Sequence, residues 1–174
     1  MSEQKIVTPK FLTTKVATQA TKTVLAAVID PDTFGYIGHV ACHIVVLAPA
    51  LIDEYPDSVN WPKAPLQPCN IYEFSLNKGP EWTASYDEIA RGKALQCWHN
   101  QNDDRTDIMP HLLFPGNTPL WGAVKRNGIV VACSGFEAWF DKMISGMIAD
   151  ICIALAYDAW MKSEDKKDAG VFLT

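Results

Sequence analysis

Apolar positions along the chain switch between helical and strand spacing, with polar interruptions between them. Apolar residues recur at helical spacing over about residues 14–28, which predicts a helix capped by Thr13 or Thr14. Residues 40–47 form a short β-branched run that is typical of a buried strand, and residues 69–76 alternate like a second strand. The first half of the chain is therefore predicted to contain one helix followed by two strands.

The second half repeats this order. Ser85 followed by Glu88 has the spacing of a capping box, which predicts a helix that begins there. Residues 120–124 and 129–133 flank an Asn-Gly pair, the strongest short signal of a β-hairpin. Residues 137–162 are apolar on almost all sides, which predicts a long helix buried by a sheet or by another subunit. Together these patterns predict an α+β fold, an antiparallel sheet with packed helices.

The two predicted strands of the first half are separated by residues 48–68, which contain five prolines. Loops of about 20 residues in compact domains are usually functional lids or disordered, and we predict such a loop here. The domain organisation that follows is a flexible arm over residues 1–11, a single domain over residues 12–162 and a charged tail over residues 163–174.

Composition narrows the classes of partner. The net charge of -5 argues against a nucleic-acid surface, and the lack of any run of about 18 uncharged apolar residues argues against a membrane span. The five cysteines form no C-x-x-C pair and the start of the chain has no leader pattern, which predicts reduced thiols and a cytoplasmic location. The chain lacks a glycine-rich phosphate loop, and Ser134 lacks a G-x-S-x-G setting, so nucleotide cofactors and a nucleophilic serine are disfavoured.

An ordered set of short motifs runs through the second half of the chain. Ser85 and residues 89–94 (Ile-Ala-Arg-Gly-Lys-Ala) are followed by the Pro-Gly-Asn-Thr-Pro loop at 115–119, by Cys-Ser-Gly at 133–135 and by Asp141. In this order and spacing the chain resembles the GlcG/HbpS-like family, which includes the C-terminal domain of PduO adenosyltransferases. The resemblance implies a profilin-like fold, a homo-oligomer and a pocket for a small or planar ligand. Some members bind haem or cobalamin-type compounds.

The chain departs from the family pattern at several positions. The family commonly carries Val-Val-Asp-x-x-Gly at the first strand turn and Arg-Met-Asp-Gly after the second strand. This chain has Val-Val-Leu-Ala at residues 45–48 and Leu-Asn-Lys-Gly at residues 76–79. Haem-binding relatives can use a histidine of the first helix as axial ligand, and residues 12–28 contain none. The departures favour a pocket rebuilt for a ligand other than haem.

Three residues are the candidates for catalysis. His111 lies in an apolar segment just before Gly116, where a histidine is more often a hydrogen-bonded core residue than a ligand contact. Asp141 lies near the start of the long helix, where the helix dipole favours a carboxylate in any case. Lys93 matches the family motif, although a lysine on an amphipathic helix more often faces solvent or forms an ion pair. In one pocket the three would transfer a proton and stabilise an enolate or a carboxylate.

Five further residues are candidates for substrate binding. Trp61 in the proline-rich loop is placed to close over a flat apolar ligand, whereas a tryptophan such as Trp121 is more often core or subunit interface. His99 and Glu137 are expected at helix ends, where they also suit the helix dipole. His43 follows His39 by four residues, but on a strand this spacing is about 13 Å, so we predict no metal site.

These residues lead to three hypotheses of function. The first is an enzyme without a cofactor, an isomerase, lyase or cyclase, that transfers a proton between His111 and Asp141 on a small organic substrate. The second is a haem- or tetrapyrrole-binding protein with His43, His99 or His111 as axial ligand. The third is a non-catalytic oligomeric module.

Overall fold

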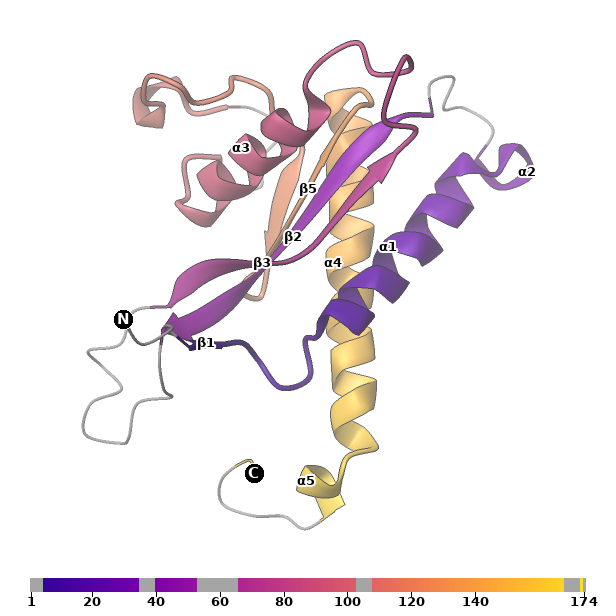
Figure 1. Ribbon diagram of the computed structural model, residues 1–174, viewed down its shortest axis with the longest axis vertical. Coiled ribbons are helices and arrows are strands. Elements are labelled where there is room, and N and C mark those ends of the chain that lie inside the picture. The colour runs from indigo at the N-terminus through magenta and orange to yellow at the C-terminus, as the bar shows by residue number, and fades with distance from the viewer. Residues whose placement is uncertain (1–4, 35–39, 53–65, 103–107, 168–172, 174) are drawn as a thin grey trace.

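The computed structural model describes residues 5–34, 40–52, 66–102, 108–167 and 173. These residues form three layers, in which an antiparallel sheet lies between helices α1 and α4 on one face and α3 on the other (Figure 1). The helices are α1 (Thr14–Ile29), the short α2 (Pro31–Phe34), α3 (Tyr86–Trp98), α4 (Ala138–Met161) and the short α5 (Glu164–Lys167). The predicted single α+β domain with an antiparallel sheet is confirmed.

The sheet is built from two hairpins joined through their inner strands. β2 (Cys42–Ile52) pairs with β3 (Gln67–Leu76), and β4 (Ala123–Arg126) pairs with β5 (Ile129–Ser134). β2 also pairs with β5, which gives the order β3-β2-β5-β4, and the two-residue β1 (Ile6–Val7) pairs with the end of β2. β2 and β5 are therefore the central strands.

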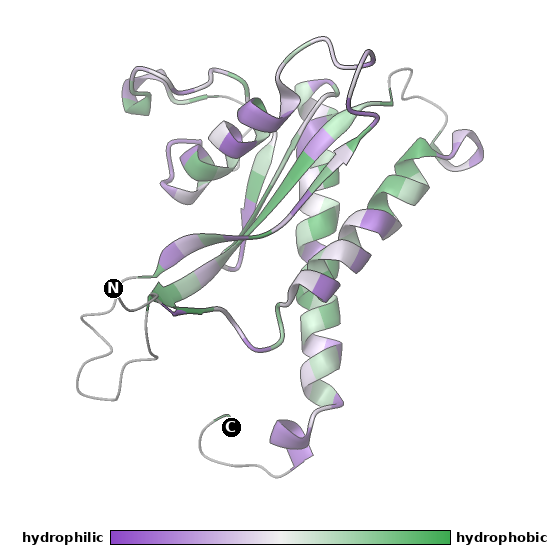
Figure 2. Ribbon diagram, viewed as in Figure 1, coloured by the Kyte–Doolittle hydropathy of each residue, from purple (hydrophilic) through white to green (hydrophobic). Residues whose placement is uncertain are grey.

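Alternate residues of the central strands supply two separate cores. On β2, Cys42, Ile44 and Val46 pack against α1 and α4, whereas Val45 and Leu47 pack against α3. Because successive side chains of a strand point to opposite faces, a strand that is covered on both faces becomes almost continuously apolar. Figure 2 shows hydrophobic residues predominating along β2 and β5.

α4 is the longest helix, and its first half packs across β4 and β5. Among the described residues it is the one helix long and apolar enough to cross a membrane. The residues that face the sheet, including Ile144, Ile148 and Cys152, are fully buried in the core. Through this face α4 belongs to the core of a globular domain, whereas its other face is exposed.

Several predicted boundaries are confirmed. Thr13 caps α1, because its Oγ1 accepts a hydrogen bond from the Val16 N–H at 3.3 Å. The Asn127-Gly128 pair forms the two-residue turn between β4 and β5, with φ of 46° and 87°. Both residues of a type I′ turn need a positive φ, which explains why this pair was a reliable signal.

Two local predictions are wrong. Ser85 makes no side-chain cap hydrogen bond, so the predicted capping box is absent, and the Asp87 carboxylate instead accepts from the Glu88 N–H at 3.1 Å. The predicted loop over 48–68 is shorter than expected, because β2 continues to Ile52 and β3 begins at Gln67. Pro49 and Pro68 face each other in this hairpin, beyond Leu47, where the pairing of β2 with β5 ends. Residues 53–65 lie outside the described residues.

The predicted arm and tail each contain a short element. Within the arm, Ile6 and Val7 form β1. Within the tail, Glu164–Lys167 forms α5, and Asp165 makes an ion pair with Lys10. The two ends of the described chain are thus connected to each other and to β2.

Candidate functional site

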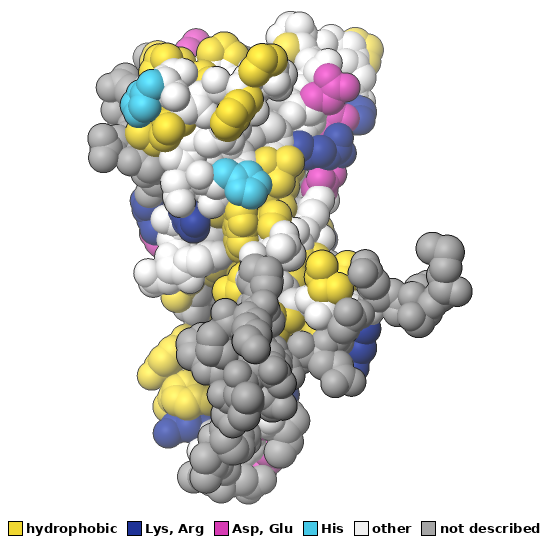
Figure 3. All heavy atoms as spheres, turned by 90° about the vertical axis from the view of Figure 1, so that its left-hand side faces the viewer, with side chains coloured by type: hydrophobic (Ala, Val, Ile, Leu, Met, Phe, Trp, Pro, Cys, Tyr) yellow, Lys and Arg dark blue, Asp and Glu magenta, His cyan; other side chains and the backbone are white. Residues whose placement is uncertain are grey.

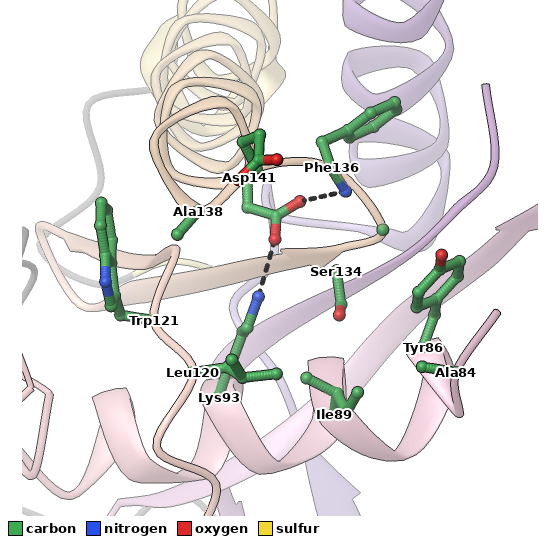
Figure 4. A pocket seen from close by; sticks show the side chains of 12 residues that line it. Ala84, Tyr86, Ile89, Lys93, Leu120, Trp121, Ser134, Phe136, Ala138 and Asp141 are labelled. Atoms are coloured by element: carbon green, nitrogen blue, oxygen red, sulfur yellow. Dashed lines mark hydrogen bonds and ion pairs between the residues drawn. The ribbon is translucent and has the colours of Figure 1, made fainter. Parts of the chain in front are cut away.

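A buried ion pair joins α3 to α4. The Lys93 Nζ lies 2.7 Å from Asp141 Oδ2, and each of these side chains is only 2% exposed. Lys93 also donates to the Cys133 carbonyl at 3.1 Å, and Asp141 Oδ1 accepts from the Phe136 N–H at 3.1 Å. Figure 4 shows the two side chains reaching toward each other from the two helices.

The ion pair forms where the sheet narrows. β4 begins only at Ala123, opposite Ala132, so the Cys133 carbonyl lies beyond the β4 ladder and is open to Lys93. The preceding residue, Gly122, has a φ of 126°, and a Cβ there would lie 2.6 Å from the Cβ of Asp141. A glycine is therefore required for α4 to bring Asp141 this close to the strand.

The next turn is equally tight. Gly135 connects β5 to α4 with a φ of 141°, and a Cβ there would lie 2.2 Å from the Ala41 carbonyl oxygen. The turn places Phe136 so that its N–H reaches Asp141. Two glycines with positive φ thus hold the backbone around the ion pair.

Burial changes the acidity of Asp141. Loss of solvent raises the pKa of its carboxyl from 3.8 to about 6, against the opposing effects of Lys93, the Phe136 N–H and the Cys133 thiol. Burial also raises the pKa of Cys133 well above its ordinary value, so this thiol stays protonated. The raised pKa brings the titration of Asp141 closer to neutral pH than that of an ordinary aspartate.

The ion pair forms part of the wall of a pocket of about 270 Å³ (Figure 4). The rest of the wall is largely apolar and aromatic. The lining comes from α3 and the residues before it, from the segment before β4, and from the turn between β5 and α4 (Ala84, Tyr86, Ile89, Leu120, Trp121, Ser134, Gly135, Phe136, Glu137 and Ala138). An ammonium group has three donors, and the Lys93 ammonium uses two of them on Asp141 and Cys133. The third has no partner among the described residues, and Lys93 lines the pocket.

The structure brings together four of the residues predicted from sequence. Lys93, Trp121, Glu137 and Asp141 all line this pocket. Glu137 is the N-cap residue of α4 but makes no side-chain cap hydrogen bond, and its side chain is exposed at the rim. Trp121 is half-buried.

His111 does not line this pocket, so the structure does not bring it together with Asp141 as the predicted proton transfer requires. His111 is exposed in a single 3-10 turn, Pro110–Leu112, and not in the core. Gln101 donates to the Leu112 carbonyl at 2.7 Å and to Asn117 Oδ1 at 3.0 Å, which fixes this segment beside the C-terminal end of α3. The pocket with the ion pair lies instead beside the first two turns of α3.

A second hollow of about 500 Å³ contains the two histidines that are exposed in the described part of the chain. His99 and His111 line it together with Gln101, Leu112, Phe114 and Asn117. Figure 3 shows histidine and hydrophobic side chains side by side on this face of the molecule. His99 is the C-cap residue of α3, as its position in the sequence predicted.

His43 lies behind the first pocket. Its Nδ1 is 2.8 Å from Ser75 Oγ, and its ring meets the Trp82 ring edge to face. Its Nε2 lies 3.4 Å from Glu73 Oε2 but makes no hydrogen bond, and burial lowers the pKa of the imidazole. His43 is therefore a buried, neutral residue. It faces the pocket residue Ser134 across the sheet without lining the pocket.

Trp61 and His39 lie outside the described residues, and so does the central part of the predicted lid. Within the described parts of the chain, no group of three or more His, Cys, Asp or Glu side chains is arranged to hold a metal ion. No protein-family model, curated protein or solved structure matches this chain.

The sequence did not single out several residues that line the pocket. Ser134 lies outside any nucleophile motif, and nothing in the sequence marks Tyr86, Ile89 or Phe136 as pocket residues. A signal for Lys93 was present, because Ala90, Lys93 and Cys97 share one helical face and both neighbours are buried. A lysine on the apolar face of a helix needs a buried partner, and that signal would have placed it in the interior.

Proposed function

We propose that this protein is an enzyme without a cofactor that transfers a proton on a small organic substrate, with Asp141 as the base and Lys93 as the group that stabilises the product of deprotonation. The observation that carries the proposal is the buried Lys93–Asp141 pair in the wall of an apolar pocket. The isomerase, lyase and cyclase classes all include such a step.

The chemistry follows from the charges of the pair. Asp141 as a carboxylate removes a proton from a carbon next to a carbonyl group, and the negative charge moves to the carbonyl oxygen of the substrate. The third N–H of Lys93 donates to that oxygen. One positive and one negative charge are present before and after the step, so no unbalanced charge develops in a buried site.

The acidity of Asp141 supports this role. A base that works near neutral pH is most effective when its pKa lies close to the working pH, and burial raises the pKa of Asp141 to about 6. Return of the proton to a different carbon completes an isomerisation, and loss of a leaving group or ring closure completes the other two reactions.

The test does not require the natural substrate. Small ketones, keto acids and aromatic carbonyl compounds are incubated with the protein in D2O, and exchange of their α-hydrogens is followed by NMR. We expect the protein to accelerate exchange for a subset that fits a pocket of about 270 Å³. Asp141→Asn should lower that exchange by roughly 10²–10⁴-fold.

Two further variants separate chemistry from folding. Ala84→Trp fills the pocket from an exposed rim position without touching the ion pair and should abolish exchange in a folded protein. Asp158→Asn makes the same chemical change at an exposed position of α4 and should leave exchange unaltered. If exchange persists in both Asp141→Asn and Ala84→Trp, the pocket with the ion pair does not catalyse it.

A second candidate function is binding of haem or another tetrapyrrole at the hollow that His99 and His111 line. It rests on two exposed imidazoles beside exposed apolar side chains, Leu112 and Phe114. His43 does not suit this role, because its ring is buried and one nitrogen is engaged by Ser75. Addition of haemin should give a Soret band that His99→Ala or His111→Ala abolishes, and a flat titration would exclude this function.

We further infer a cytoplasmic location. All five cysteines are free, and four of them are buried thiols inside the core. Such thiols persist where the environment is reducing. A fusion protein located by fluorescence microscopy, compared with marker proteins of the cytoplasm and the cell envelope, tests this inference.

A further inference from the structure

The side of α4 that faces away from the sheet is apolar and exposed. Along it, the side chains of Trp139, Met147, Tyr157 and Met161 are 58%, 38%, 62% and 47% exposed. Figure 2 shows that α4 stays largely hydrophobic along its length, including the part that extends past β4 and β5. Monomeric proteins rarely leave a continuous apolar strip of this kind in water.

A hollow of about 420 Å³ lies in the first half of this side, around Gly146. Its walls are Trp139, Lys142, Met143, Met147 and Asp150 of α4 and Arg126 at the end of β4. A Cβ on Gly146 would have only one neighbour outside its own helix within 4 Å, the Arg126 guanidinium at 3.7 Å. Gly146 is itself buried, but it borders the hollow, and a side chain there would meet little of the rest of the chain.

Two of the three charged residues of the hollow, Lys142 and Asp150, are placed symmetrically about Gly146, and Asp150 also lies 3.8 Å from the Nε of the third, Arg126. Lys142 lies four residues before this glycine and Asp150 four residues after it, so each is about 6 Å away along the helix axis. A two-fold axis through Gly146 would place a second α4 antiparallel to the first. Lys142 of each copy would then face Asp150 of the other copy, and Met147 of each copy would enter the hollow of the other.

We propose that a second copy of this chain docks on this surface, with the two α4 helices antiparallel and their Gly146 residues at the two-fold axis. Closed symmetric dimers use one self-complementary patch on both subunits, and the Lys142–Gly146–Asp150 arrangement has that property. A membrane is a poorer partner, because the chain has a net charge of -5 and an anionic lipid surface attracts basic helices.

The surface is small for a protein–protein interface. α4 has 24 residues and is therefore about 36 Å long. One helix face of this length lies at or below the roughly 800 Å² per partner of a standard interface. We therefore expect a dimer that dissociates in the micromolar range.

Sedimentation equilibrium of the full chain tests the proposal. The wild type should reach twice the monomer mass of 19.3 kDa as its concentration rises from micromolar to millimolar. Lys142→Glu and Asp150→Lys each create two repulsive contacts in the symmetric dimer, and each should raise the dissociation constant by about tenfold or more. An equal mixture of the two variants should restore the affinity, because both contacts are attractive again in the mixed dimer.

Controls separate the surface from general effects of charge and folding. Lys22→Glu makes the same change of charge on an exposed position of α1 and should leave the dissociation constant unchanged. Gly146→Gln fills the hollow and should give a folded monomer, as circular dichroism would verify. The proposal fails if the wild type remains a monomer at millimolar concentration, whether or not it binds anionic vesicles. It fails equally if the dissociation constant of the mixture is no lower than that of each variant alone.

Discussion

At the scale of single residues, the pair of Lys93 and Asp141 is unusual in its cost. Removing two charges from water costs several kcal/mol per ion, and their attraction repays this only with good geometry and further hydrogen bonds. Here the further bonds come from the Cys133 carbonyl and the Phe136 N–H. A pair of apolar residues often stabilises a fold as well as a buried ion pair does, so stability alone does not account for these two charges.

A comparison of single and double variants tests the energetic side of this argument. Lys93→Met leaves the Asp141 carboxyl buried without its cation, and we expect it to lower the free energy of unfolding by roughly 3–5 kcal/mol at pH 7. Asp141→Asn should cost a similar amount. The double variant should be more stable than either single variant, because no uncompensated charge remains. Urea unfolding of the wild type, the two single variants and the double variant measures the coupling energy between Lys93 and Asp141. If the losses of the two single variants simply add up in the double variant, the two residues do not stabilise each other.

At the scale of elements, local signals succeeded where the backbone itself decides the outcome. The Asn127-Gly128 turn and the Thr13 cap each depend on a conformation or a bond within a few residues. The predicted capping box does not form, because the side chain of Asp87, and not that of Ser85, accepts a backbone hydrogen bond in the first turn of α3. The prolines of residues 48–68 predicted a loop that is too long. Pro49 and Pro68 lie within β2 and β3, whose other residues pair with each other along both strands.

Two glycines with the same backbone constraint allow a matched test of the turn beside the ion pair. Gly122 and Gly79 have φ of 126° and 144°, so an alanine at either position carries a strain of about 1–3 kcal/mol. A Cβ at Gly79 has no neighbour within 4 Å, whereas a Cβ at Gly122 would collide with Asp141. We therefore expect Gly122→Ala to cost roughly 1–3 kcal/mol more than Gly79→Ala in thermal or urea unfolding. Equal losses would show that the space beside Asp141 is not limiting.

At the scale of the whole molecule, the fold could be predicted from the sequence, whereas the site could be predicted only in part. Periodicity identified the main helices and strands because it is a property of each segment. The partnership of Lys93 with Asp141 joins residues 48 positions apart, on helices that cover opposite faces of the sheet. The placement of His111 likewise depends on Gln101 and Asn117, two polar residues whose contacts no local pattern reveals.

Stability as a function of pH depends on the whole molecule, because two buried groups act on it with opposite signs. The pKa of His43 in the folded protein lies below its ordinary value of 6.5. Its contribution is therefore present above pH 6.5 and is lost as the pH falls through the folded pKa. The pKa of Asp141 is raised from 3.8 to about 6, so its contribution is present below about pH 3.8 and is lost as the pH rises through 6.

Replacement of His43 separates these two effects. His43→Asn keeps a polar group near the position of Nδ1, which contacts Ser75, and removes the titration. On acidification from pH 7 to 5, the wild type should lose stability relative to this variant, with a slope of at most about 1.4 kcal/mol per pH unit for one proton. His111→Asn, at an exposed position, should follow the wild type. Parallel curves for wild type and His43→Asn would mean that His43 takes up its proton in the folded protein as easily as in the unfolded chain, and burial would then not govern its charge.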